Sequence, residues 1–167
     1  MIQRLLQAVR ERREHRQLAL RARPIARVHE LLDQPVTSER GGLQLAGAFC
    51  NPKPVQRPYP PIMTGGRSAP ILRVTAEHAD LWNIPGGDID DAARRSARLD
   101  RYCAEIGRDP ASITRSIVLA ISYDHPDRTR VAIAEALAAG FRHIVLSVPS
   151  PYPDGVARWI ADELVTG

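Results

Sequence analysis

The segment PKPVQRPYPPIMTGGRSAPILRVTAEHADLWN runs from Pro52 to Asn83, and its pattern decides the fold. A short apolar run, Pro61 to Thr64, stops at Gly65 and Gly66, and a helical pattern follows from Ser68. This order predicts a strand, a tight turn and a helix. Two glycines let the backbone come close to a ligand, and the N-terminus of the following helix favours an anion at the turn.

The turn has two interpretations. In the first, Gly65 and Gly66 hold a phosphate against the helix N-terminus, Arg67 adds a charge-assisted contact, and Ser68 opens the helix. In the second, the glycines form a plain tight turn with no ligand. The turn residues alone leave both interpretations open.

Three more strand and helix units follow along the chain. Their strands are predicted over Asp80 to Asn83, Ile113 to Tyr123 and His143 to Val148, with a loop at Ile84 to Gly87. The four helices are predicted from Ala69 to Ala79, from Asp88 or Asp90 to Gly107, from Asp124 to Ala139, and over Val156 to Leu164. Four such units in succession predict a parallel sheet with right-handed crossovers.

Helical spacing and strand position also predict which side chains are buried. The stripe of the second helix is predicted to be Ala92, Leu99, Cys103 and Ile106. The face of the sheet away from the helices is predicted to hold Ile62, Val118, Leu119, Ile121 and, depending on register, Val145 or Leu146.

The chain before the decisive segment divides into two parts. Residues 1–22 are arginine-rich and predict a basic arm, either helical or disordered, and residues 23–167 form the predicted domain. A helix is predicted from Pro24 to Gln34, and the glycines and prolines of residues 36–60 predict a loop with at most a short hairpin. No aromatic residue is interleaved with the arginines of the arm, so nucleic acid is not an expected partner.

Several motifs together resemble a known family. The PKPVQRPYPPI lead-in, the IMTGG strand end and the ADLWN that follows one helix later resemble the C-terminal half of the luciferase-like monooxygenases. Further on, GRDPASI before a strand and GFRHIVLSV before the last helix fit the same pattern in the same order. The family consists of flavin- or F420-dependent (β/α)8 barrels.

The resemblance implies an α/β fold that is the C-terminal half of such a TIM-type barrel, preceded by N-terminal helices. A complete barrel has about 250 residues, whereas this chain has 167. The implied activity is that of a flavin- or F420-dependent oxidoreductase or monooxygenase, with its N-terminal catalytic half missing. The alternative is a non-catalytic half-barrel, either a fragment or a subunit that needs a partner chain.

The resemblance also implies a site. Gly65, Gly66, Arg67 and Ser68 would hold the phosphate of FMN or F420, and Trp82 and Asn83 would border a pocket for the cofactor or a small-molecule substrate. The alternative for Trp82 is a place in the core, where a tryptophan at a strand end lies at least as often. The tryptophan and asparagine at the strand end and the arginine-rich composition favour F420. The family's catalytic residues come from the first four strands, so catalytic residues stay unknown. Self-association, or pairing with an N-terminal half-barrel, is expected.

Composition excludes other classes of protein. The 23 basic residues include a single lysine, and the net charge is +4. Cys50 and Cys103 form neither a disulfide framework nor a metal motif, which fits a cytoplasmic protein. The histidines show no metal-ligand spacing, and no apolar run is long enough to span a membrane.

Overall fold

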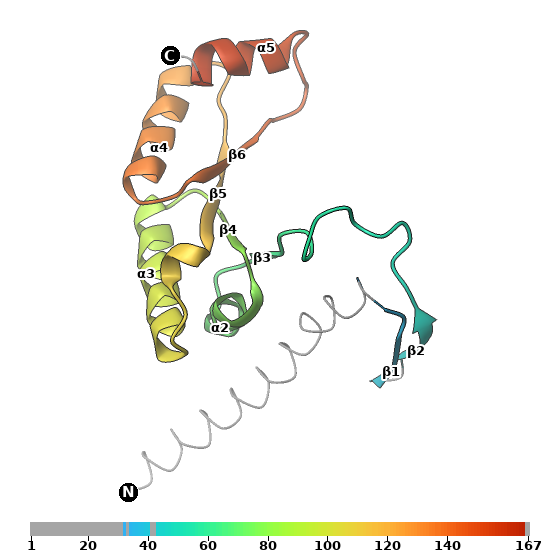
Figure 1. Cartoon of the computed structure of the whole chain (residues 1–167). Helices are drawn as coiled ribbons and strands as arrows, with labels where there is room; N and C mark the ends of the chain where they lie inside the picture. The colour runs from blue at the N-terminus through green and yellow to red at the C-terminus, as the bar shows by residue number, and fades with distance from the viewer. Residues whose placement is uncertain (1–31, 33, 41–42, 166–167) are drawn as a thin grey trace, which may run out of the picture.

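A computed structural model describes residues 32, 34–40 and 43–165 of the chain (Figure 1). The predicted basic arm, residues 1–22, lies outside the described residues. So does almost all of the helix predicted from Pro24 to Gln34.

A hairpin precedes the main sheet. Strand β1 (Val36–Arg40) pairs antiparallel with β2 (Leu43–Ala48), which confirms the expectation of a short hairpin. Residues 49–62 then continue without helix or strand, because their prolines lack the N–H groups that a ladder needs. The hairpin lies away from the four-stranded sheet (Figure 1).

The main sheet has four parallel strands in the order β3-β4-β5-β6. They are β3 (Met63–Gly65), β4 (Leu81–Pro85), β5 (Thr114–Ala120) and β6 (His143–Ser147). Each strand hydrogen-bonds to the next one in the chain, which confirms the predicted parallel order. Consecutive neighbours of this kind are the arrangement found in an α/β barrel.

Two strand boundaries differ from the prediction. Ile84 and Pro85 were predicted in a loop, but they extend β4, because Ile84 pairs with Ile117 and is fully buried in the core. Strand β5 ends at Ala120 rather than at Tyr123. Its last register partner on β6 is Ser147, which is also the end of that strand.

A helix follows each strand. They are α2 (Ala69–His78), α3 (Ile89–Glu105), α4 (Pro126–Ala138) and α5 (Val156–Ile160), the last running on into a π-helical turn, η2 (Ala161–Val165). A short 3-10 turn, η1 (Pro110–Ser112), leads into β5. Of the two caps predicted for α3, Asp88 is the one observed, since its Oδ1 accepts from the Asp91 N–H at 2.8 Å.

The core lies between the sheet and its helices. Trp82, Ile84, Ile117 and Leu119 point from the strands into one buried cluster with residues of the helices. Of the predicted stripe on α3, Ala92, Leu99 and Cys103 are buried there. Ile106 is a correction, because α3 ends at Glu105 and the Ile106 side chain is 51% exposed.

The register of β5 and β6 decides which side chains lie on the face of the sheet away from the helices. Because side chains alternate along a strand, Leu119 and Leu146 lie on the helix side, where Leu119 joins the core and Leu146 packs against it. The face away from the helices carries Val118 and Val145, as predicted, together with Met63. Met63 is 47% exposed and Val145 is 37% exposed, so this face is open.

Candidate functional site

The turn between β3 and α2 is built by two glycines with different roles. Gly65 ends β3 in ordinary extended backbone. Gly66 has φ +133°, a conformation that residues with a Cβ rarely adopt. The Gly66 N–H donates to the backbone oxygen of Asn83 at 3.2 Å, which ties the turn to β4.

The N-terminus of α2 keeps several backbone donors open. Ser68 occupies the N-cap position, but no side chain caps the helix and its first turn holds no acidic residue. The N–H groups of Arg67, Ser68, Ala69 and Ile71 have no acceptor among the described residues. Free N–H groups at the positive end of a helix dipole suit an anion.

Trp82 contacts the turn from the core side of the sheet. Its side chain is fully buried, its indole Nε1–H donates to the Gly66 oxygen at 2.9 Å, and its ring lies 6.3 Å from the ring of Phe141. A side chain in this position has no surface left for a ligand. The expectation that Trp82 borders a pocket is therefore replaced by a role in holding the turn.

Asn83 lies on the opposite face of the sheet, beside Gly65. Its side-chain amide donates to Ser116 Oγ at 2.8 Å, and Ser116 Oγ is 2.8 Å from His143 Nδ1. These three residues pair across β4, β5 and β6 and form one polar row on the face of the sheet away from the helices, where Ser116 is fully buried. Of the two predicted pocket residues, Asn83 is the one that can face a ligand.

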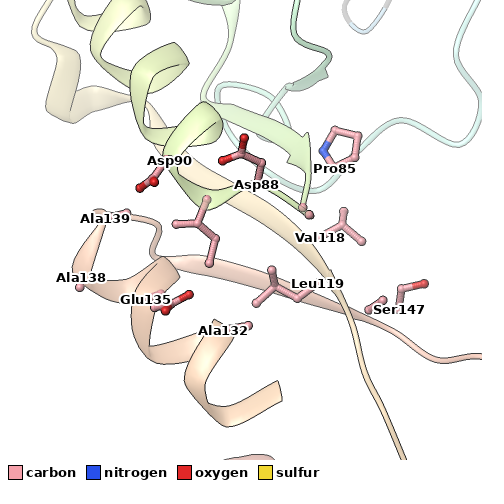
Figure 2. Close-up of a pocket in the computed structure, with 14 residues that line it drawn as sticks. Pro85, Asp88, Asp90, Val118, Leu119, Ala132, Glu135, Ala138, Ala139 and Ser147 are labelled. Atoms are coloured by element: carbon pink, nitrogen blue, oxygen red, sulfur yellow. The ribbon is translucent and has the colours of Figure 1, made fainter. Parts of the chain in front are cut away.

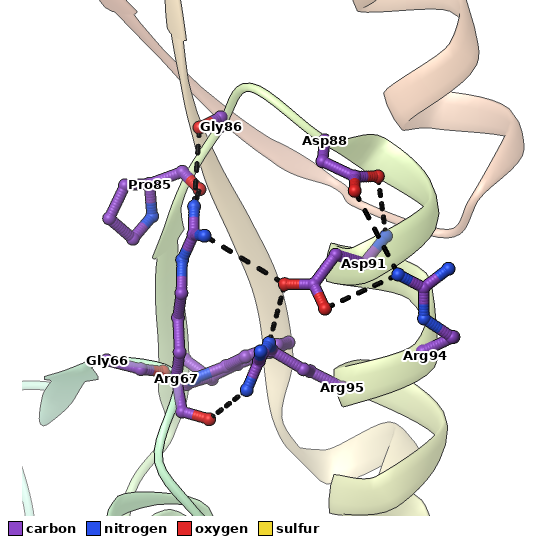
Figure 3. Close-up of polar contacts among 9 residues, drawn as sticks. Gly66, Arg67, Pro85, Gly86, Asp88, Asp91, Arg94 and Arg95 are labelled. Atoms are coloured by element: carbon purple, nitrogen blue, oxygen red, sulfur yellow. Dashed lines mark hydrogen bonds and ion pairs between the residues drawn. The ribbon is translucent and has the colours of Figure 1, made fainter.

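Arg67 points away from the turn. One guanidinium nitrogen donates to the Pro85 oxygen at 2.5 Å, and another is 3.9 Å from Asp91 Oδ2 (Figure 3). Its side chain therefore joins the end of β4 to the start of α3. Arg67 contributes its backbone N–H to the turn, whereas the predicted side-chain contact with a phosphate needs a change of rotamer.

Asp91, in the first turn of α3, forms ion pairs with three arginines. Arg95 Nε donates to its carboxylate at 2.7 Å, Arg94 approaches it to 3.5 Å, and Arg95 also donates to the Arg67 oxygen at 2.5 Å (Figure 3). The hydrogen bond from Arg95 has the largest effect and lowers the pKa of Asp91. Desolvation comes next and opposes it, and the charges of Arg95, Arg94 and Arg67 add to the lowering.

Sequence inspection missed both the arginine cluster and the polar row. The Asp91 and Arg95 pair lies at helical i,i+4 spacing and could have been found from the sequence. The row from Asn83 through Ser116 to His143 depends on the register of three strands, and nothing in the linear sequence reports that register.

A separate cavity of about 900 Å³ lies between the start of α3 and the later turns of α4 (Figure 2). Leu119 and Ala132 contribute apolar surface, and three carboxylates, of Asp88, Asp90 and Glu135, line it as well. Pro85 and Gly86, the acceptors of Arg67, form one side, so the cavity and the glycine turn lie on opposite sides of the β4 end.

The described residues include neither a metal-binding cluster nor a membrane-spanning helix. No group of three or more His, Cys, Asp or Glu side chains among them could hold a metal ion. None of their helices combines the length and the apolar character that crossing a bilayer requires.

A model of the luciferase-like monooxygenase family matches residues 10–163. The chain belongs to this family. The match begins inside residues 1–22, the segment predicted as a basic arm, and includes the whole strand and helix region. A comparison with curated proteins gives no significant match.

Solved structures of luciferase-like enzymes share the fold. An F420-dependent secondary alcohol dehydrogenase, in complex with an F420-acetone adduct, superposes with TM-score 0.66 at 14% identity over 87% of this chain. A coenzyme F420 dependent tetrahydromethanopterin reductase from Methanopyrus kandleri gives TM-score 0.64 at 13% identity over 83% of this chain.

The chain spans 60% of the length of each of these two proteins. Its fold is α/β, with a four-stranded parallel sheet and helices that match part of a luciferase-like TIM barrel.

Proposed function

We propose that this chain forms the C-terminal part of a flavin- or F420-dependent oxidoreductase and holds the cofactor phosphate at the turn from Gly65 to Ser68. The observation that carries the proposal is the set of open N–H groups at the N-terminus of α2. They follow a glycine pair that leaves the backbone accessible. A phosphate group fits such a cradle because it accepts several backbone hydrogen bonds at once.

The residues around the turn keep the cradle in shape. Trp82 holds the Gly66 oxygen from the core side, and the Asn83 backbone holds the Gly66 N–H. Asn83 also presents its side chain on the open face, where Ser116 fixes the direction of its amide. Asn83 would therefore border the cofactor or a small-molecule substrate.

FMN or F420 supplies the redox chemistry when bound, and the protein positions it. Both cofactors carry a phosphate, so the turn suits either. The two similar structures described above are those of F420-dependent enzymes, and this supports F420 for this chain. A cytoplasmic location suits the two free cysteines, Cys50 and Cys103.

The remaining part of the active site would come from a partner, either an N-terminal half-barrel or a second copy of this chain. The open face around Met63 and Val145 supports this, and so do the outer edges of β3 and β6, which pair with no other described strand. The rival hypothesis, a half-barrel without cofactor, rests on the same open face.

Gly65→Val provides the test. A Cβ at Gly65 meets only the Asn83 oxygen, at 3.8 Å, and the backbone there is ordinary, so valine fits the strand. Its methyl groups would stand on the open face beside Asn83 and crowd a phosphate at the turn. We expect FMN and F420 to bind about 10- to 30-fold more weakly, as for the loss of about 2 kcal/mol of charge-assisted hydrogen bonding.

Titration of each cofactor, followed by fluorescence, measures the effect. Gly66→Val is a poorer test, because φ is +133° there and the new Cβ would lie 3.3 Å from Ile71. Equal affinities of the wild type and Gly65→Val would contradict a phosphate at this turn. Failure of the wild type to bind either cofactor would favour the half-barrel without cofactor.

A further inference from the structure

Four arginines line one side of α3. Arg94, Arg95, Arg98 and Arg101 surround a surface depression of about 640 Å³, together with Asp91 and Ala97. Arg94, Arg98 and Arg101 follow one another at i, i+4 and i+7, so their side chains leave the helix on the same side. We call Arg94, Arg95, Arg98 and Arg101 the arginine face.

The arginine face carries more positive charge than its neighbours neutralise. Among the described residues, Asp91 is the only carboxylate that lines the depression, and it already interacts with Arg67, Arg94 and Arg95. Arg98 and Arg101 form no ion pair with any described residue.

Asp88, at the start of α3, is 3.9 Å from Arg94 and neutralises part of its charge, whereas two further carboxylates of α3 pair outside the arginine face. Asp100 pairs with Arg115 on the sheet, and Glu105 pairs with Arg73 on α2 at 2.8 Å. The excess charge of the arginine face is therefore available to a ligand with several negative groups.

The arginine face begins at the glycine turn. Arg95 donates to the backbone oxygen of Arg67, the residue that follows Gly66 (Figure 3). A ligand whose phosphate lies at the α2 N-terminus can therefore extend along α3 past Arg95 toward Arg98 and Arg101. The two candidate cofactors differ in whether they carry further anionic groups beyond the phosphate.

We propose that the arginine face binds the polycarboxylate chain of F420, and that this chain therefore takes F420 rather than FMN. The proposal rests on the phosphate site proposed above. F420 continues beyond its phosphate into a lactate and a chain of glutamates, whereas FMN ends at the phosphate. Guanidinium groups bind carboxylates in paired hydrogen bonds, and arginine does so in a fixed fork geometry.

The composition of the depression argues against nucleic acid as the ligand. Its lining contains no aromatic side chain on which a base could stack. All four arginines come from a single helix, so they follow a short linear anion better than a wide duplex surface.

The experiment compares two double variants of the full chain. R98Q/R101Q removes the two arginines without ion partners among the described residues, and both positions are exposed. R128Q/R158Q is the matched control, because it removes two exposed arginines from α4 and α5 that likewise have no ion pair with a described residue. The ligands are F420 with its glutamate chain, the same deazaflavin shortened to the phospholactate, and FMN.

We expect the wild type to bind F420 with its glutamate chain about 5- to 10-fold more tightly than the shortened form, as for two exposed charge pairs. This preference should shrink as salt is raised. R98Q/R101Q should lose the preference and bind both forms alike, whereas the R128Q/R158Q control should keep it.

Failure of this proposal is distinguishable from failure of the phosphate site. Equal binding of the long and short forms by the wild type would overturn the role of the arginine face and leave the phosphate site standing. If no flavin or deazaflavin binds, free oligo-γ-glutamate becomes the deciding ligand.

Oligo-γ-glutamate should bind the wild type and the control, and R98Q/R101Q more weakly. Absence of that difference would overturn the proposal. So would equally tight, equally sensitive binding of an RNA of the same charge, because the face would then be a general polyanion surface.

Discussion

Gly86, just after β4, and Gly65, at the end of β3, differ in the space available for a side chain. A Cβ built on Gly86 would lie 2.2 Å from the Val118 oxygen, and the Gly86 N–H donates to that same oxygen at 2.6 Å. The chain therefore passes against the backbone of β5 with no room for a side chain. Gly65 has no such neighbour.

We therefore expect Gly86→Ala to lower the free energy of unfolding by about 3 kcal/mol, because backbone atoms must move to relieve the contact. Gly65→Ala should change it by less than about 0.5 kcal/mol, as expected for an open position. Urea unfolding followed by circular dichroism measures both. Similar stability of the two variants would show that the β4 end can shift away from β5.

The tight contact of Gly86 could not be predicted from the sequence. The pair Gly86 and Gly87 was predicted as an ordinary loop, and the loop is real from Gly86 onward. Its close contact with Val118 depends on the parallel register of β4 and β5. That register is a tertiary property, and the local sequence does not encode it directly.

At the scale of an element, β5 is joined to α3 by a buried arginine. The Arg115 guanidinium donates to Ser96 Oγ at 3.0 Å and to the Ile113 oxygen at 2.7 Å, and it forms an ion pair with Asp100. The Arg115 side chain is nearly buried, whereas that of Asp100 is 50% exposed. The two partners therefore differ in what their removal leaves behind.

Asp100→Ala should lower the free energy of unfolding by about 2 kcal/mol, because it leaves a buried guanidinium without its counterion; the usual cost is reduced here since Asp100 is half exposed. Arg115→Met should cost about 1 kcal/mol or less, because an apolar chain of similar length fills the same space. Chemical denaturation at neutral pH compares them. A larger loss for Arg115→Met would mean that its hydrogen bonds to Ser96 and Ile113 outweigh the ion pair.

The helices were the most predictable elements of this chain. Prolines at the first turns of α2 and α4, the Asp88 cap of α3 and the glycines after α3 and α4 mark the helix ends directly in the sequence. Strand ends were less predictable. Ile84 looked like the start of a loop because a proline and two glycines follow it, yet its pairing with Ile117 keeps it in β4.

Only part of the candidate site could be predicted from the sequence. The position of Gly65 and Gly66 before a helix was visible in the sequence, because it is a local pattern of strand, turn and helix. For Trp82 the sequence left a pocket position and a core position both open, because the face on which a strand residue lies depends on what packs against the sheet. Arg67 was assigned by proximity in sequence, and its side chain turns toward Pro85 and Asp91.

At the scale of the whole molecule, helices cover one face of the sheet, and no described helix covers the other face. Exposed apolar side chains such as Met63 and Val145 lie on the open face, and β3 and β6 are edge strands of the described sheet. Open parallel edges and exposed apolar surface favour association.

We expect the isolated chain to form dimers or larger species at micromolar concentration, as measured by size-exclusion chromatography with light scattering. Val145→Glu, on the open face, should weaken that association, whereas Val131→Glu is the matched control, because Val131 is an exposed valine on α4. A monodisperse wild-type monomer that unfolds cooperatively would show that the half-barrel needs no second wall.

The polar row on the open face has a consequence for how the edge strand finds its place. Ser116 Oγ meets His143 Nδ1 only when His143 stands opposite it, and a slip of β6 by one residue would bring Ile144 or Arg142 to that position. Ser116 is fully buried, so its hydroxyl would lose a partner that water cannot easily replace. The same slip would also move Ile144 and Leu146 off the helix side, where they pack against the core. The contact between Ser116 and His143 therefore adds a polar requirement to the apolar packing that sets the register of β6.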